Sequence, residues 1–173
     1  PMSARPPVPA PVRQGAALRV RGLLGRGKGG ALESRASASR DEATAVKTAA
    51  ALGIPQSYGS YAALLADPEI EAIYNPLPNH LHVPLTLQAA AAGKHVLCEK
   101  PIALTAPEAM QLRAAAGKVL IAEAFMVRFH PQWLRARELV RSGRIGALRA
   151  VQMFFGYNNV DPNNVRNKAD IGG

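Results

Sequence analysis

The sequence predicts an α/β fold in which a parallel sheet is covered by helices on both faces. From about Ser39 onward, short apolar strand patterns alternate with helical patterns. The connections between them are short and marked by Gly or Pro, which is typical of repeated βαβ units. Hydrophobic residues make up 48% of the 173 residues and charged residues 19%, a composition typical of globular proteins rather than disordered ones.

The N-terminal part departs from this alternation. Residues 1–17 contain recurrent Pro and show no strand or helical period, so we expect them to be disordered or extended. Residues 18–30 begin like a short strand and end in glycines that fit G-x-G-x-x-G at 25–30. The segment from Gly30 to Ser39 is too short for a helix of about ten residues and a strand of about five. Either the first βαβ unit is incomplete, or this segment does not join the sheet.

Helix and strand signals follow in order after Ser39. Asp41 and Glu42 place acidic residues in the first turn of one helix, and Gly53 and Gly93 close two helices. The expected elements are a helix over 41–52, a short helix over 61–65, a strand over 70–75 and a helix over 83–92.

The alternation continues toward the C-terminus. Thr105 is a good N-cap, and Glu108 lies three residues later, as in a capping box. Gly117 and Gly143 mark the ends of two helices. The expected elements are a strand over 95–98, a helix from 106 to about 117, a strand over 119–122, a helix over 131–141 and a strand over 147–155.

The net charge of +9 is concentrated near the N-terminus. Residues 1–40 hold eight basic residues and one acidic residue, whereas residues 41–173 hold thirteen basic and eleven acidic residues. There is no aromatic interleaving and no zinc-finger or RNA-recognition signature, so we expect no nucleic-acid partner. No apolar run reaches the roughly 18 residues of a membrane span, and no secretory signal is visible. We therefore expect a cytoplasmic protein outside the membrane.

The cysteine and histidine content argues against a metal site. Cys98 is the one cysteine, which excludes an internal disulfide and a multi-cysteine zinc site. At the end of an apolar strand, it is expected to be a small core residue rather than an activated nucleophile. His80 and His82 are two residues apart and would need further ligands, so we expect no metal.

Polar residues gather where the predicted strands end. The strand over 70–75 is followed by Pro76–His82, and the strand over 95–98 by Glu99, Lys100 and Pro101. The strand over 119–122 is followed by a run that contains Arg128. Because a parallel sheet binds ligands at the carboxyl ends of its strands, the sequence predicts a binding site built from these segments.

Two runs at these strand ends carry a specific resemblance. They are YNPLPNHLHVPLTLQAAAAGKHVLCEKPIAL at residues 74–104 and AEAFMVRFHPQW at residues 122–133. Over about residues 36–173 the chain resembles the Gfo/Idh/MocA family of NAD(P)-dependent oxidoreductases. The resemblance implies a Rossmann-like, doubly wound dinucleotide-binding domain over 36–128 and the beginning of an incomplete α+β substrate domain over 129–173. Residues 1–35 are then an atypical segment, disordered or altered by a shifted reading frame.

The resemblance also implies roles for individual residues. Lys100 would be the catalytic lysine, because a proton must leave the substrate oxygen as a hydride leaves the carbon. The family suggests a cis bond between Lys100 and Pro101. Arg40 follows the second strand with no acid at the strand end, which favours the 2′-phosphate of NADP over NAD. The implied cofactor-binding residues are Ser39, Arg40, Leu77, Pro78, Asn79, His82, Glu99, Lys100 and Arg128.

The implied activity is hydride transfer between NADP, or NAD, and the secondary alcohol or ketone of a small-molecule sugar, polyol or dihydrodiol. Family members are often homo-oligomers, but the usual interface and a second acid/base group would follow residue 173. We therefore expect impaired turnover in this chain and an unprotected apolar strand over 147–155. The alternative is a non-catalytic nucleotide-binding remnant or regulatory paralogue, which the altered N-terminal part favours.

Overall fold

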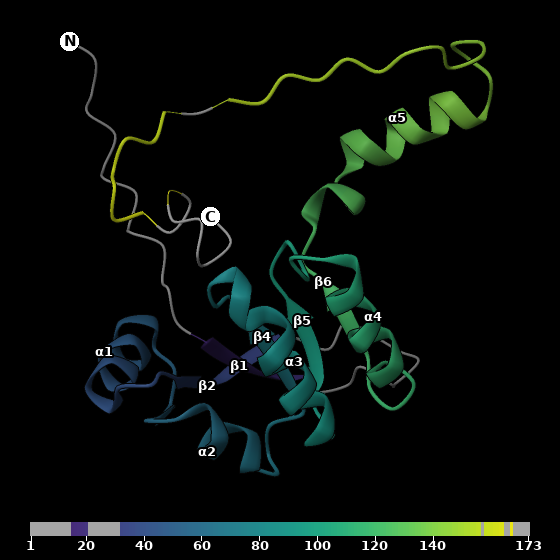
Figure 1. Ribbon diagram of the computed structural model, residues 1–173. Coiled ribbons are helices and arrows are strands. Elements are labelled where there is room, and N and C mark those ends of the chain that lie inside the picture. The colour runs from purple at the N-terminus through teal and green to yellow at the C-terminus, as the bar shows by residue number, and fades with distance from the viewer. Residues whose placement is uncertain (1–14, 21–31, 157, 165–166, 168–173) are drawn as a thin grey trace.

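A six-stranded sheet forms the centre of the computed structural model, which describes residues 15–20, 32–156, 158–164 and 167 (Figure 1). The strand order β3-β2-β1-β4-β5-β6 is that of a doubly wound α/β sheet. The predicted fold class is therefore confirmed. The strands are β1 (Gly15–Val20), β2 (Leu32–Ala38), β3 (Gln56–Tyr58), β4 (Ala72–Asn75), β5 (His95–Cys98) and β6 (Ile121–Glu123).

Within this sheet, β1 runs against its neighbours. It pairs antiparallel with both β2 and β4, whereas the pairs β2–β3, β4–β5 and β5–β6 are parallel. Only residues 21–31 connect β1 to β2, which is shorter than the dozen or so residues that a parallel crossover needs. Residues 15–20 join the sheet, so the expectation that this segment stays outside it is wrong for these residues. The expectation of an incomplete first βαβ unit stays a prediction. The glycines at 25–30 lie outside the described residues.

Five helices lie between and after the described strands. Asp41 caps the first of them, since its Oδ2 accepts the Thr44 N–H at 2.8 Å. Thr105 caps another as predicted, because its Oγ1 accepts the Glu108 N–H at 3.4 Å. The helices are α1 (Glu42–Leu52), α2 (Tyr61–Ala66), α3 (His82–Ala91), α4 (Ala106–Ala115) and α5 (Pro131–Arg141), with short 3₁₀ turns η1 (Asn79–Leu81) and η2 (Met126–Arg128).

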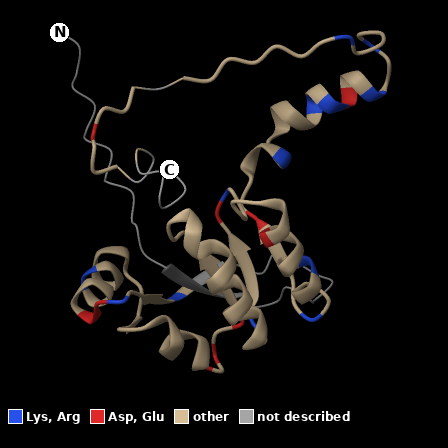
Figure 2. Ribbon diagram, viewed as in Figure 1, with Lys and Arg blue, Asp and Glu red and all other residues tan. Residues whose placement is uncertain are grey.

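The strand expected over residues 147–155 is absent, so this prediction was wrong. A strand needs a neighbour to hydrogen-bond, and no strand among the described residues lies beside this segment. It follows α5, which projects away from the sheet (Figure 1) and carries most of the charged residues of that region (Figure 2). Val151 is 77% exposed and Phe154 is 95% exposed, so the apolar side chains that suggested a buried strand face solvent.

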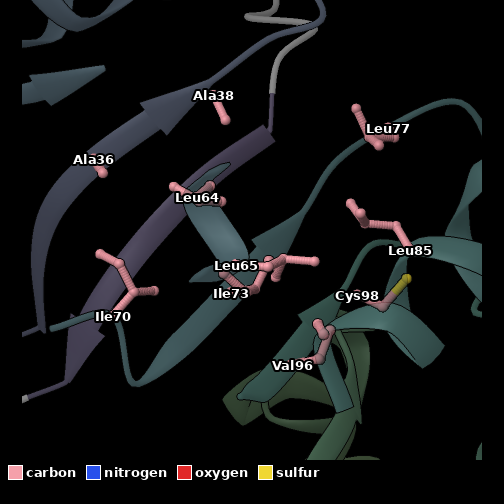
Figure 3. Packing of buried hydrophobic residues seen from close by; sticks show 11 residues of the cluster. Ala36, Ala38, Leu64, Leu65, Ile70, Ile73, Leu77, Leu85, Val96 and Cys98 are labelled. Atoms are coloured by element: carbon pink, nitrogen blue, oxygen red, sulfur yellow. The ribbon is translucent and has the colours of Figure 1, made fainter. Parts of the chain in front are cut away.

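The hydrophobic core lies where the sheet meets its helices (Figure 3). Ile73 of β4 and Val96 of β5 are 2% and 3% exposed, and Leu64 and Leu65 of α2 pack into the same cluster. Small residues complete it: Ala36 and Ala38 of β2 and Ala89 of α3 are fully buried. These small side chains allow helix and strand to approach closely.

Replacing Ile73 by alanine tests this core. The variant Ile73→Ala should lose about 2–5 kcal/mol of the free energy of unfolding, because it removes buried carbons and leaves a cavity. The matched control Leu52→Ala, at a side chain that is half exposed at the end of α1, should lose less than about 1 kcal/mol. Urea unfolding followed by circular dichroism measures both. Equal losses in the two variants would contradict the placement of the core.

Candidate functional site at the carboxyl ends of the strands

Backbone hydrogen bonds continue across the sheet beyond the strand ends. The Glu99 N–H donates to the Asn75 carbonyl at 2.9 Å, and the Ala124 N–H donates to the Cys98 carbonyl at 2.7 Å. The turns that follow β4, β5 and β6 are thereby held at one edge of the sheet. The first residues of these three turns therefore lie side by side at the carboxyl ends of the strands.

The turn after β2 carries the first two candidate residues. Ser39 is 9% exposed, and its Oγ accepts the Asp41 N–H at 3.3 Å, so this side chain shapes the start of α1. Arg40 is exposed. Burial raises the pKa of Tyr61, and the positive charge of Arg40 lowers this pKa by a smaller amount. The Arg40 guanidinium therefore lies near Tyr61, the first residue of α2. Ser39 and Arg40 therefore present one hydroxyl and one cation close together.

Of the candidate residues in the turn after β4, one lies in the core and two lie at the surface. Leu77 is 6% exposed and belongs to the hydrophobic core, so its side chain faces inward rather than into a crevice. Pro78 and Asn79 are partly exposed at the start of η1, where the Pro78 carbonyl accepts the Leu81 N–H at 2.8 Å. Both residues therefore lie at the surface of this turn, in contrast to Leu77.

His82, the first residue of α3, is buried and linked to two turns. Its Nδ1 lies 2.6 Å from the Pro101 carbonyl oxygen and its Nε2 lies 2.7 Å from the Leu77 carbonyl oxygen. Asn75, which is fully buried, donates from Nδ2 to the His82 backbone carbonyl at 3.2 Å. The imidazole thus binds the chain itself, joining the turn after β4 to the turn after β5.

The turn after β5 carries the candidate catalytic lysine. The Lys100 side chain is exposed, its backbone N–H donates to Glu99 Oε2 at 3.2 Å, and the Lys100–Pro101 peptide bond is cis, as the resemblance implied. Tyr74 donates from its hydroxyl to Glu99 Oε1 at 2.7 Å. Burial and this carboxylate raise the pKa of Tyr74 to about 12. The Glu99 carboxylate is therefore fixed by two hydrogen bonds, while the side chain of the next residue, Lys100, is exposed.

The turn after β6 supplies a further carboxylate that the sequence prediction had not included. Glu123 Oε1 accepts the Ile102 N–H at 3.0 Å and so connects β6 to the segment after Pro101. Arg128 lies on η2 and is exposed. Tyr74 and Asn75 were also missed. The sequence did offer one signal for them, since Tyr74 and Asn75 stand at the end of an apolar strand. An amide buried there needs hydrogen-bond partners, which would have predicted contacts to the neighbouring turns.

Cys98 behaves as predicted for a core residue. It is fully buried, and burial raises the pKa of its thiol to about 11, which disfavours the nucleophilic thiolate. Within residues 15–20, 32–156, 158–164 and 167, no group of three or more His, Cys, Asp or Glu could hold a metal ion. No helix in the described part of the chain is long and apolar enough to cross a membrane.

Comparison with known proteins gives a consistent assignment. The sequence profile of an oxidoreductase family with an NAD-binding Rossmann fold matches residues 19–121. The chain is 53% identical to an uncharacterized oxidoreductase of Rhizobium meliloti, over 82% of this chain and 43% of that protein. It is 46% identical to a D-xylose 1-dehydrogenase (NADP(+)) of Haloferax volcanii, over 82% of this chain and 44% of that protein. The chain spans less than half the length of these relatives.

A solved structure shares the fold. It is a mutant 3-ketoreductase from Actinomadura kijaniata in complex with TDP-benzene and NADP, with 37% identity and a TM-score of 0.61. The similarity covers 68% of this chain and 36% of that chain. The carboxyl edge described above lies within the part of the chain that the family profile matches, apart from Arg128 and Glu123, which follow it.

The bond between Tyr74 and Glu99 makes a testable contribution to stability. Tyr74→Phe should lower the free energy of unfolding at neutral pH by about 1–2 kcal/mol, because it removes a hydrogen bond to a carboxylate. The pKa of Tyr74 is raised in the folded state, so this contribution is complete below pH 10 and is lost as the pH rises toward 12. Denaturant unfolding at neutral pH and between pH 10 and 12 measures both effects.

Tyr61→Phe is the control for loss of a tyrosine hydroxyl, since Tyr61 is not bonded to Glu99. It should change stability at neutral pH by less than about 0.5 kcal/mol. If Tyr74→Phe and the unsubstituted chain lost stability in parallel between pH 10 and 12, the Tyr74–Glu99 bond would not exist in solution.

Proposed function

Since the chain belongs to the Gfo/Idh/MocA family of oxidoreductases with an NAD-binding Rossmann fold, we propose that it binds NADP at the carboxyl edge of its sheet and acts in hydride transfer. The substrate is the secondary alcohol, or the ketone, of a sugar, polyol or dihydrodiol. One observation carries the proposal: Lys100 is exposed at the carboxyl end of β5, in a turn bonded to both neighbouring turns.

The side chains at this edge fit the chemistry of a nicotinamide dinucleotide. The exposed guanidinium of Arg40 suits the 2′-phosphate of NADP, and Ser39 beside it offers a hydroxyl. Asn79 offers an amide, and Glu99 a carboxylate that can accept hydrogen bonds from ribose hydroxyls. The bound cofactor supplies the hydride acceptor or donor. NAD in place of NADP would leave Arg40 without its phosphate.

Lys100 is the residue for the proton. When an alcohol is oxidised, its oxygen loses a proton as the adjacent carbon loses a hydride, and the amine of Lys100 takes that proton. In the reverse direction the ammonium of Lys100 returns it to the carbonyl oxygen. The turn around Lys100 fixes where the side chain begins, while its exposed end can reach a substrate at the edge.

The reversed β1 favours a second candidate function, that of a nucleotide-binding protein without turnover. Val20 and Leu32, which flank residues 21–31, pair with each other at the edge opposite the carboxyl ends of β2 and β4. In dinucleotide-binding sheets the turn after the first strand binds the pyrophosphate at the carboxyl edge. With β1 reversed, its own carboxyl end no longer points there.

Binding of the two cofactors distinguishes NADP from NAD. The thermal midpoint of the chain should rise more with NADPH than with NADH, and Arg40→Ala should weaken NADPH binding about 10-fold or more by removing a charged hydrogen-bond donor. Its affinity for NADH should stay unchanged. Thermal unfolding and fluorescence titration provide the two readouts. The control Arg113→Ala, at an exposed arginine of α4, should leave both affinities unchanged. No shift with either cofactor would contradict the proposed binding.

Turnover tests the role of Lys100. Lys100→Met should lower NADP-linked oxidation of sugars and diols about 10²- to 10⁴-fold, because the proton acceptor is gone. NADPH binding should change little, which separates chemistry from binding. The matched control is Lys118→Met, at an exposed lysine that follows α4. This variant should keep full activity. A chain that binds NADPH but turns over no sugar or diol would favour the non-catalytic candidate.

A further inference from the structure

We propose that His82 is a doubly protonated imidazolium that positions Lys100 by clamping the turn after β5 to the turn after β4. His82 is here a positioning residue, since its ring faces the protein interior and is 1% exposed. The importance of holding Lys100 rests on the proposed function. The protonation state and the clamp themselves rest on geometry alone.

Both ring nitrogens of His82 face acceptors. Nδ1 lies 2.6 Å from the carbonyl oxygen of Pro101, and Nε2 lies 2.7 Å from the carbonyl oxygen of Leu77. A peptide carbonyl has no proton to give. The N–H that shares a peptide group with the Pro101 carbonyl is that of Ile102, and it already donates to Glu123 Oε1. Each of the two contacts can therefore be a hydrogen bond only if the ring nitrogen is the donor.

Counting protons then fixes the charge of the ring. A neutral imidazole has one N–H, so its other nitrogen would point a lone pair at a carbonyl lone pair across less than 3 Å. Rotating the ring by half a turn would place ring carbons against both carbonyls and leave two buried nitrogens without these partners. Only the imidazolium, with an N–H on each nitrogen, satisfies both carbonyls.

Two short hydrogen bonds offset part of the cost of burying the charge. A buried cation is costly unless it is hydrogen-bonded, and both contacts have the short lengths of charge-assisted hydrogen bonds. The acceptors are themselves held. Asn75 accepts the Leu77 N–H on Oδ1 at 3.3 Å and donates from Nδ2 to the backbone carbonyl of His82 at 3.2 Å. The ring and the turn after β4 are thus fixed to the end of that strand.

The clamp acts on the residue next to Lys100. His82 holds the carbonyl of Pro101 from the side of β4, and Glu123 holds the N–H of Ile102 from the side of β6. The chain leaving Lys100 is therefore bound on both sides, while the lysine side chain stays exposed. Loss of either bond would let this turn open without disturbing the apolar core.

Nitrogen NMR of the unsubstituted chain tests the charge. With ¹⁵N-labelled histidine, His82 should show two protonated ring nitrogens of similar shift at neutral pH, and His82→Gln should remove that signal from the four histidines. A single protonated nitrogen, with its neighbour shifted far downfield, would overturn the imidazolium assignment. This measurement needs neither cofactor nor activity. It therefore decides the protonation of His82 even if the proposed function fails.

Hydrogen exchange tests the clamp. Glutamine carries both donors on one nitrogen and cannot reach both carbonyls, so His82→Gln should speed exchange of the Ile102 amide about 10-fold or more. The Val96 amide, in the middle of β5, should keep its rate, which a general loss of stability would not allow. The matched control His80→Gln, two residues earlier and exposed, should change neither rate. Unchanged exchange at Ile102 in folded His82→Gln would overturn the positioning role.

Should His82→Gln fail to fold, the unsubstituted chain still decides the clamp. Couplings through the hydrogen bonds, from the two ring nitrogens to the carbonyl carbons of Leu77 and Pro101, should both be present. Absence of the coupling to Pro101 would overturn the clamp. If NADPH binds neither variant nor the unsubstituted chain, the proposed function fails while the NMR result stands.

Discussion

The hydrogen bonds that cross from one strand end to the next determine what lies at the carboxyl edge. The Asn75 carbonyl binds the Glu99 N–H, and the Cys98 carbonyl binds the Ala124 N–H, so the three turns begin in register. Asn75 and His82 then connect the turns by their side chains. Asn75 and His82 are buried polar residues that would be costly if unpaired, so their bonds tie the formation of the edge to that of the core. The exposed side chains of the site have a rigid base for this reason.

The length of one connection determines the direction of β1. The connection between Val20 and Leu32 is shorter than the dozen or so residues that a parallel crossover needs, and β1 pairs antiparallel with both of its neighbours. The position is filled because β2 and β4 would otherwise each expose an unpaired edge in the middle of the sheet. The strand order of a doubly wound sheet is thus preserved, whereas the direction of β1 is reversed. Strand pairing determines the order, and the length of the connection determines the direction.

Local signals in the sequence predicted most elements, whereas features that depend on tertiary partners were missed. The bounds of β5 and α5 matched the expectation because Gly93, Pro131 and Gly143 mark their ends. β3 was missed because its three residues have little apolar pattern. The strand over 147–155 was wrongly predicted because pattern cannot supply a neighbour to pair with. Within the site, resemblance identified Glu99 and Lys100, but the bond from Tyr74 and the inward orientation of His82 depend on residues distant in sequence.

Positive charge at the carboxyl edge comes from side chains rather than from free helix ends. One N-terminal amide of α1 and one of α4 are already occupied, since Asp41 accepts the Thr44 N–H and Thr105 accepts the Glu108 N–H. The carboxylate of Asp41 also adds negative charge where an anion would otherwise be attracted. At the proposed site, a phosphate would therefore be met chiefly by an exposed cation such as Arg40. Attraction by exposed side chains is screened by salt more strongly than binding to a buried cradle of backbone amides. The reversal of β1 thus bears on how tightly phosphate is held, whereas the turn around Lys100 depends on β4, β5 and β6 alone.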